Sequence, residues 1–218
     1  MRLLNAAIGG AILLTLAVLL SGWPTLAADK GIIKHDAIVN FEDGCTGFHI
    51  GDGLIVTAGH CAIGASTKAF YFRDGQRGGA TVALSSNPLT GFEDFAVFRA
   101  SNAEAINAVH LDCGATIIEG MAVRMTGYPG VSKKEGSDGF GRATVWGRVA
   151  ASEILPSDPW WRKPVLRVNI SSMGGFSGSP VFSERSNKVI GILVGSMNDN
   201  HSLAFVQPLA PVCAMLGR

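Results

Sequence analysis

Three short segments carry side chains whose combination can do chemistry: a histidine, an acid and a serine, in that order along the chain. His60 follows the run VTAG at 56–59, Asp94 stands before an apolar run at 95–98, and Ser177 lies within a glycine-rich stretch at 174–178. A serine hydroxyl is a poor nucleophile at neutral pH and needs a base that takes its proton as it attacks. An imidazole suits that role because it titrates at about pH 6.5, and a carboxylate beside it fixes its orientation and stabilises its positive charge. The three residue types together indicate acyl transfer by an activated serine.

Each segment taken alone also has an ordinary structural interpretation. A single histidine after a strand is more often structural, an acid before an apolar run is a common strand start, and a serine between glycines can be any tight turn. Glu93, beside Asp94, is interpreted as a solvated loop acid. The combination, rather than any one segment, therefore carries the chemical argument.

The elements that must position these residues are short strands separated by turns rich in Gly, Asp, Ser and Asn. A helical pattern occurs at 103–109 and at 208–216, and 101–119 is the least strand-like stretch, which we interpret as the connection between two halves. Many short strands with glycine-rich turns predict an all-β fold, built as antiparallel barrels or a sandwich. The strands are expected at 54–58, 67–72, 80–84, 95–98, 122–125, 143–149, 165–168, 189–194 and 203–206.

The composition excludes two broad classes of protein. The 218 residues are 47% hydrophobic with a formal net charge of +1, which does not describe a disordered chain. The charges of the 18 basic and 17 acidic residues nearly cancel, and the basic residues are not clustered in a stripe. We therefore expect no nucleic-acid partner.

The first residues have the layout of a secretory signal peptide. Arg2 supplies a positive start, residues 6–20 are almost entirely apolar, and Pro24 precedes the small-residue stretch 25–28. We expect cleavage after Ala27 or Ala28, which assigns 1–27 to the signal and predicts a secreted or periplasmic protein with no membrane association afterwards. The alternative, an uncleaved anchor, would need about 20 apolar residues to span a bilayer, more than this run provides.

The four cysteines all lie in the predicted exported part. An even number of cysteines in an exported chain favours disulfides, although four cysteines allow three pairings. The chain has no C-x-x-C, no H-x-x-x-H and no histidine cluster, so no metal site is expected.

In this order and spacing, the three segments resemble the chymotrypsin-like, or trypsin-like, serine peptidases over almost the whole predicted mature chain. The runs TAGHC at 57–61 and GFSGSPVF at 175–182 are highly specific, and the Asp94 segment is moderately so. The run GYPG at 127–130, followed by a glycine-containing loop, SGSPVF and VIGI, looks like the bacterial V8-like, glutamyl-endopeptidase branch. The resemblance implies two antiparallel six-stranded β-barrels, an N-terminal one over 28–110 and a C-terminal one over 111–218 with a short terminal helix, and an active site between them.

The resemblance also assigns roles to individual residues. It implies a catalytic triad of His60, Asp94 and Ser177. It places the donors for the developing oxyanion on the backbone N–H groups of Gly175 and Ser177, where preorganised donors stabilise the transition state. It pairs Cys45 with Cys61, which would stabilise by about 3 kcal/mol in the chain-entropy model, and leaves Cys113 to Cys213.

The substrate pocket departs from the trypsin pattern. Alignment with the family puts Ser171 and Ser172 at the pocket floor and Val194, Gly195 and Ser196 at its wall, with no aspartate to hold Arg or Lys. Leu193 stands where glutamyl endopeptidases carry a histidine, and His201 downstream is interpreted as a surface-loop residue. Neutral or small apolar substrate side chains and glutamate therefore remain open as the preferred residue.

Two further departures concern activation and support. Phe176 replaces the aspartate that pairs with a newly cut N-terminus in zymogen-activated trypsins, so that activation switch is not expected. Val194 also stands where the family often places a polar residue beside the catalytic aspartate, which leaves the support of Asp94 unaccounted for.

The function implied by the resemblance is a secreted serine endopeptidase that hydrolyses protein or peptide substrates through an acyl-enzyme. We expect a monomer with no cofactor. The alternatives are a catalytically inactive binding protein on a peptidase scaffold and an esterase, because the same acyl-transfer machinery cleaves esters.

Overall fold

The computed structural model describes residues 36–86, 93–101, 106–130, 141–154, 164–197 and 200–218. The predicted signal peptide, 1–27, lies outside these residues. Residues Lys34–Arg218 form one compact unit. Within the described residues, no helix combines the length and the hydropathy that crossing a bilayer would require.

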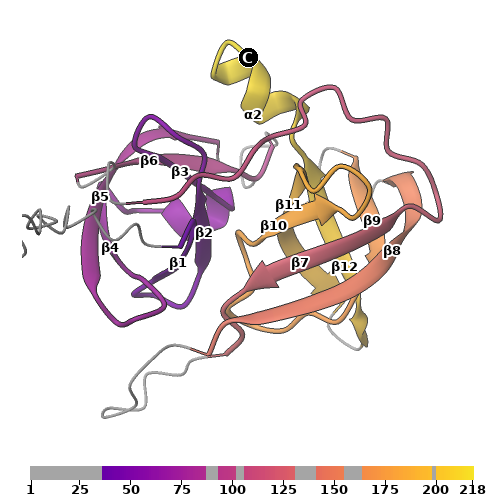
Figure 1. Cartoon of the computed structure of the whole chain (residues 1–218), viewed down its shortest axis with the longest axis horizontal. Coiled ribbons are helices and arrows are strands. Elements are labelled where there is room, and N and C mark those ends of the chain that lie inside the picture. Colours follow the sequence, from indigo (N-terminus) through magenta and orange to yellow (C-terminus); the bar gives the residue numbers. More distant parts are fainter. Residues whose placement is uncertain (1–35, 87–92, 102–105, 131–140, 155–163, 198–199) are drawn as a thin grey trace, which may run out of the picture. The chain divides into compact units, whose positions relative to one another are not determined.

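Twelve strands form two closed antiparallel barrels of six, which confirms the predicted fold (Figure 1). The N-terminal barrel has the order β1-β2-β3-β6-β5-β4 and consists of β1 (Ile38–Phe41), β2 (Thr46–His49), β3 (Leu54–Thr57), β4 (Thr67–Tyr71), β5 (Arg77–Ser85) and β6 (Ala96–Ala100). The C-terminal barrel has the order β10-β11-β12-β9-β8-β7 and consists of β7 (Ala122–Gly127), β8 (Ala143–Ile154), β9 (Val165–Asn169), β10 (Pro180–Ser183), β11 (Val189–Met197) and β12 (Asn200–Pro208).

Two short helical elements complete the described fold: the 3₁₀ helix η1 (Gly59–Ala62) after β3, and α2 (Ala210–Met215) after β12. The helix predicted at 208–216 is thus confirmed. Of the helical pattern at 103–109, residues 103–105 lie outside the described residues, and 106–109 are not helical: they contain one isolated bridging residue and otherwise no regular structure. Its apolar positions instead contact the cores, Ile106 in the N-terminal barrel and Val109 between the barrels.

Strands β1 and β2 were not predicted, and a glycine explains part of the difficulty. A Cβ atom on Gly47 would lie 2.6 Å from Phe41 Cε2 and 2.9 Å from Ile55 Cγ2. The barrel therefore requires glycine at a position in β2 where a strand pattern would show a side chain.

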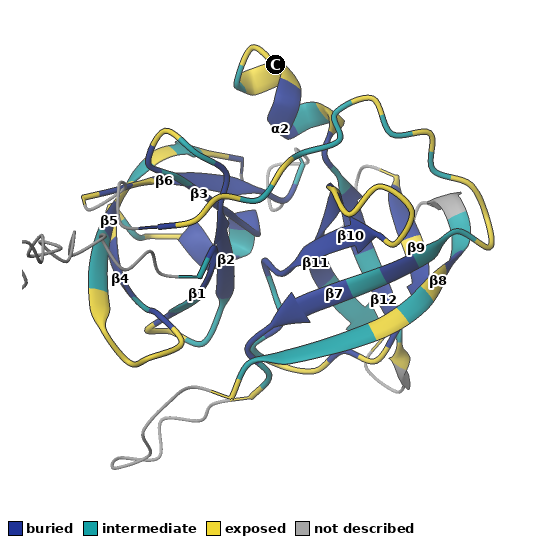
Figure 2. Ribbon diagram, in the orientation of Figure 1, coloured by how far each residue is buried: buried dark blue, intermediate teal, exposed yellow. Residues whose placement is uncertain are grey.

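Three apolar clusters hold the described fold together, and buried residues are concentrated on the strands of both barrels (Figure 2). The N-terminal barrel is filled around Phe41, whose ring lies 6.4 Å from Phe70 and 5.2 Å from Phe98 between centroids. The C-terminal barrel buries aliphatic residues such as Met125 and Ile190. The third cluster joins the two barrels and includes Ile38, Val56, Phe95, Tyr128, Val194 and Leu209. Each such large side chain contributes roughly 1.5–3 kcal/mol when fully buried, so the seam between the barrels is itself a core.

Candidate active site

His60 lies on η1, directly after β3. Its neighbour Gly59 lets η1 approach the Asp94 segment, because a Cβ there would lie 2.2 Å from Ser86 O and 2.8 Å from Phe95 N. The glycine of the TAGHC run is thus needed for backbone packing. The His60 side chain is 34% exposed and so remains accessible from solvent.

Asp94 is the buried partner of His60. Its side chain is 2% exposed, its Oδ2 lies 2.8 Å from His60 Nδ1, and its Oδ1 accepts a hydrogen bond from the backbone N–H of His60 at 2.7 Å. With Asp94 on Nδ1, the other ring nitrogen, Nε2, is left as the proton acceptor. The predicted histidine and aspartate are therefore brought together in the geometry of a base and its orienting carboxylate.

Support for Asp94 comes from a residue that the sequence did not indicate. Gln207 on β12 is 3% exposed, and its Oε1 accepts a hydrogen bond from Asp94 N at 3.5 Å. Val194, which stands at the family's usual supporting position, is buried in the seam between the barrels. The polar contact to Asp94 N thus comes from Gln207 on β12 and not from the position of Val194 on β11.

Both predicted disulfides are present. Cys45–Cys61 joins the residue before β2 to η1, and Cys113–Cys213 joins the connection between the barrels to α2. Sulfur atoms of the first pair lie within 4.8 Å of a His60 ring nitrogen. Because these sulfurs are bonded to each other, they are not available as thiolate ligands for a metal.

Ser177 lies on a loop, 173–178, whose carbonyl groups are held one after another. Phe176 N donates to Met173 O, Gly130 N to Gly174 O, Ser179 N to Phe176 O, and Thr46 N to Ser177 O. The Thr46 hydroxyl donates to Gly175 O at 2.9 Å. In the described part of the chain, the N–H groups of Gly175 and Ser177 donate to no protein group. The two predicted oxyanion donors are thus free for a ligand.

The loop packs tightly against the histidine segment and against the 128–130 turn. Gly175 has φ of +94°, and a Cβ there would lie 2.4 Å from Tyr128 O. A Cβ on Gly178 would lie 2.1 Å from Thr46 O and 3.0 Å from Ala58 N, two residues before His60. No hydrogen bond joins Ser177 Oγ to His60 among the described residues; such contacts are often long without substrate and tighten when it binds.

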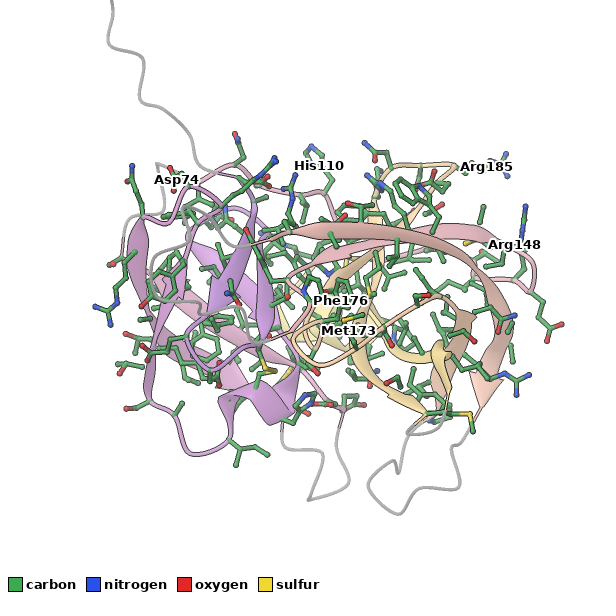
Figure 3. All side chains as sticks on the ribbon, turned by 90° about the horizontal axis from the view of Figure 1, so that it is seen from below. Asp74, His110, Arg148, Met173, Phe176 and Arg185 are labelled. Carbon is green, nitrogen blue, oxygen red and sulfur yellow. A yellow bond between two sulfur atoms is a disulfide. The ribbon has the colours of Figure 1, made fainter. Side chains whose placement is uncertain are left out.

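Phe176 anchors the loop to the core of the C-terminal barrel. Its side chain is 2% exposed and packs into the core of the C-terminal barrel, and Figure 3 shows it with Met173 near the boundary between the barrels. The position that carries an aspartate in zymogen-activated trypsins is therefore filled by an apolar contact.

The predicted pocket residues come from neighbouring strands. Ser171 and Ser172 follow β9, and Val194, Gly195 and Ser196 lie on β11, while β12 pairs with both strands. Ser172 is 1% exposed, and its Oγ has no hydrogen-bond partner in the described structure. None of the five side chains carries a charge. Leu193 is buried in the core of the C-terminal barrel, and the side chain of His201 lies outside the described residues.

Two polar residues near the site, Thr46 and Tyr128, were not indicated as functional by the sequence. Tyr128 is buried, its hydroxyl donates to Ile38 O at 3.3 Å, and burial raises the pKa of Tyr128 to about 12. A threonine after a half-cystine and a tyrosine in a turn have no distinctive pattern, so no sequence signal separates them from ordinary core residues.

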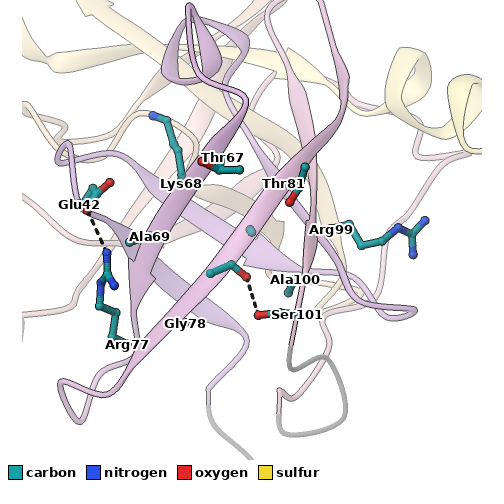
Figure 4. Close-up of a pocket in the computed structure, with 12 residues that line it drawn as sticks. Glu42, Thr67, Lys68, Ala69, Arg77, Gly78, Thr81, Arg99, Ala100 and Ser101 are labelled. Atoms are coloured by element: carbon teal, nitrogen blue, oxygen red, sulfur yellow. Dashed lines mark hydrogen bonds and ion pairs between the residues drawn. The ribbon is translucent and has the colours of Figure 1, made fainter.

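A separate groove of about 760 Å³ lies on the N-terminal barrel across β4, β5 and β6 (Figure 4). Small residues such as Gly79 and Ala100 line it, and Arg77 at its edge pairs with Glu42 at 3.7 Å. None of the predicted site residues lines this groove.

Comparison with protein families decides the relationship. The model of the trypsin-like peptidase domain matches residues 45–192. The chain belongs to this family. The match spans the segments of His60, Asp94 and Ser177, and peptidase chemistry is the activity of the class. No curated protein sequence matches the chain.

Solved structures support the fold at low sequence identity. The Rv3671c protease of M. tuberculosis, in its active form, is 21% identical with a TM-score of 0.63, covering 83% of this chain and 78% of that one. The serine endoprotease from Yersinia pestis is 20% identical with a TM-score of 0.62, covering 85% of this chain and 63% of that one. The HtrA-type protease AlgW, determined with a decapeptide, is 18% identical with a TM-score of 0.64, covering 79% of this chain and 50% of that one.

Proposed function

We propose that this trypsin-like peptidase is an exported serine endopeptidase that cleaves peptide bonds through an acyl-enzyme on Ser177. The observation that carries the proposal is the His60–Asp94 pair: a buried carboxylate bonded to Nδ1 of an accessible imidazole. This arrangement fixes the ring and stabilises the positive charge that the ring gains when it removes a proton. An inactive scaffold protein has no need of it.

The proposed reaction has two halves, acylation and deacylation of Ser177, and His60 acts as a base and then as an acid in each. Ser177 Oγ attacks the scissile carbonyl carbon while His60 Nε2 takes its proton, and the N–H groups of Gly175 and Ser177 bind the resulting oxyanion. The tetrahedral intermediate collapses as His60 returns the proton to the leaving amine, which leaves an ester on Ser177. His60 then deprotonates a water molecule that attacks this ester, and the carboxylic acid product leaves as Ser177 regains its proton.

The pocket supports neutral substrate residues at the cleavage site. Its five predicted residues are uncharged, and Leu193, at the position of the glutamyl-endopeptidase histidine, is buried in the barrel core and not available to bind a carboxylate. We therefore favour a neutral or small apolar side chain over glutamate. The GYPG, SGSPVF and VIGI runs support placing the chain near the V8-like branch.

Export and assembly are part of the same proposal. The apolar start of the sequence and the two disulfides support a secreted or periplasmic protein, since disulfides persist in oxidising compartments. We propose that it acts as a monomer on protein or peptide substrates. Sequencing the N-terminus of the protein recovered outside the cytoplasm tests export: a start at residue 28 or 29 is expected, and a retained Met1 would contradict it.

The function is tested by comparing hydrolysis of a peptide library and of matched esters by the wild type and by Ser177→Ala. We expect cleavage of peptides after neutral residues, and a loss in kcat of about a million-fold in the variant, the size known for triad knockouts. The Ser177→Ala protein should keep its circular dichroism and its melting temperature. Hydrolysis of esters alone would support the esterase alternative, and a variant that kept a tenth of the wild-type rate would exclude Ser177 as nucleophile.

A further inference from the structure

We propose that Thr46, a residue of the N-terminal barrel, is the positioning residue that holds the oxyanion loop of the C-terminal barrel in its working conformation. Here the oxyanion loop means residues 173–178. The inference rests on the proposed function and adds to it a residue outside the three motifs. Thr46 touches neither the scissile bond nor the reacting atoms in this scheme; it acts through the loop.

Thr46 makes three hydrogen bonds that converge on the site. Its hydroxyl donates to Gly175 O at 2.9 Å and accepts from Tyr128 N at 3.0 Å, while its backbone N–H donates to Ser177 O at 2.8 Å. A single hydroxyl therefore joins the turn at 128–130 to the oxyanion loop, and one residue bonds both residues whose N–H groups form the oxyanion hole.

The orientation of the two donors follows from the planarity of the peptide unit. In a trans unit the carbonyl and the N–H point in opposite directions, so fixing one fixes the other. Gly130 N holds the Gly174 carbonyl and thereby aims the Gly175 N–H; Ser179 N holds the Phe176 carbonyl and thereby aims the Ser177 N–H. The unit between them is held at its carbonyl by Thr46 Oγ1.

Thr46 also acts indirectly on the peptide unit between Gly174 and Gly175, which carries the Gly175 N–H. Its hydroxyl fixes Tyr128 N, two residues before the Gly130 N–H that holds the Gly174 carbonyl. Gly174 and Gly175 have no side chain to restrict rotation of their peptide units. The hydrogen bonds to their carbonyls therefore restrain two successive peptide units, the one that carries the Gly175 N–H and the one that follows it.

Burial makes the Thr46 hydroxyl difficult to replace. Thr46 is fully buried, and Thr57 Oγ1 donates to Thr46 O at 2.7 Å, which fixes the residue in place. The Gly175 carbonyl is part-buried, and a shielded carbonyl that loses its donor incurs a desolvation cost unless it finds another. On the described loop, the N–H of Ser177, two residues after Gly175, has no acceptor, so without Thr46 Oγ1 we expect the loop to rotate and consume this donor of the oxyanion hole.

Three variants separate this role from a structural one. Thr46→Val keeps the shape of the side chain and removes the hydroxyl, and Thr46→Ser keeps the hydroxyl and removes a methyl group. Thr126→Val is the matched control: Thr126 is 8% exposed, and its Oγ1 bonds Oγ1 of Thr144, which is not a residue of the oxyanion loop, at 3.0 Å. Each is assayed for kcat and KM on a neutral peptide ester and for the rate of covalent labelling by a fluorophosphonate.

We expect Thr46→Val to lower kcat and the labelling rate by about 10- to 100-fold with KM within about threefold, because loss of a single oxyanion donor lowers kcat by roughly a hundredfold or more. Thr46→Ser should stay within about threefold of wild type in kcat, and so should Thr126→Val. Wild-type kcat in Thr46→Val, an equal loss in Thr46→Ser, or a change confined to KM would overturn the inference.

If Thr46→Val does not fold, Thr46→Ala takes its place, because it also removes the hydroxyl and its smaller side chain fits the buried site without overpacking. A folded Thr46→Ala with wild-type kcat would overturn the inference equally. A wild-type protein that neither hydrolyses the ester nor reacts with the fluorophosphonate would contradict the proposed function itself. Equal labelling of wild type and Thr46→Val would contradict the role of Thr46 alone.

Discussion

The two halves of the site are held in different ways. His60 and Asp94 are held mainly within one barrel, by two hydrogen bonds that the Asp94 carboxylate accepts from His60 and by a disulfide at the residue after His60. The Ser177 loop is fixed by hydrogen bonds to its backbone carbonyls, and two of these bonds are donated by Thr46 in the other barrel. The acid–base half thus depends on side chains that carry chemistry, and the oxyanion half depends on donors supplied from outside its own motif.

The largest effect expected in the acid–base half is that of Asp94→Asn. The amide keeps the shape of the side chain but presents a donor that favours the wrong tautomer of His60, so kcat should fall about ten-thousand-fold, the size known for this change in a Ser-His-Asp triad. Steady-state kinetics on a neutral peptide measures the loss, and an unchanged melting temperature controls for folding. A loss under tenfold would show that Asp94 does not orient the base.

Removing the two disulfides separately sharpens the comparison. In the chain-entropy model, the 16-residue separation of Cys45–Cys61 stabilises by about 3 kcal/mol and the 100-residue separation of Cys113–Cys213 by about 4.7 kcal/mol. Urea unfolding of the two double-alanine variants should therefore show the greater loss of stability for Cys113 and Cys213. Activity per folded molecule should fall for the Cys45 and Cys61 variant, whose bridge adjoins His60, and the reverse assignment would contradict the account.

The pH dependence of the unfolding free energy tests the contact that Tyr128 makes between the barrels. Its pKa is raised to about 12 by burial, above the ordinary value of 10, so its neutral form stabilises the fold fully below pH 10 and that stability is lost as the pH rises towards 12. The loss amounts to about 2–3 kcal/mol of unfolding free energy. In Tyr128→Phe the fold should lose about 1 kcal/mol at neutral pH and show a shallower decline above pH 10.

Unfolding free energies of wild type and Tyr128→Phe between pH 7 and 12 provide the measurement. Comparison of the two proteins removes the contribution of the other groups that titrate in this range. Parallel curves would show that Tyr128 is not the group whose ionisation destabilises the fold.

The smallest effect is expected for Gln207→Leu. The contact to Asp94 N is long, at 3.5 Å, and a neutral hydrogen bond contributes about 1 kcal/mol, so kcat should fall no more than about fivefold. The peptide assay used for Asp94→Asn measures it. A loss above a hundredfold would place the main support of Asp94 in the C-terminal barrel and reverse the comparison between the two halves.

The barrel architecture could be predicted from the sequence through family resemblance, and the structure brings His60 and Asp94 together as the motifs indicated. The catalytic roles of His60, Asp94 and Ser177 stay predictions that rest on distinctive residue types and local motifs. The residues that hold them could not be predicted, because Thr46 meets Gly175 across 129 positions and Asp94 meets Gln207 across 113. No local pattern reports a contact that only the closed barrels create.

The errors in the predicted secondary structure also come from contacts between distant parts of the chain. The apolar spacing at 103–109 suggested a helix, but Ile106 and Val109 are spaced to meet two different cores. Gly47 concealed strand β2 because the barrel leaves no room for a side chain there. In each case tertiary packing, which the sequence does not display, decided the local structure.

The most direct test of the account is to locate the covalent adduct that a fluorophosphonate forms with the folded protein. Intact-mass measurement followed by peptide mapping should show one adduct, on Ser177, formed by the wild type and absent from Ser177→Ala and from heat-unfolded wild type. That result would mean that the hydroxyl is activated by the folded site. The absence of an adduct on native protein, or an adduct on a residue other than Ser177, would contradict the assignment of Ser177 as nucleophile.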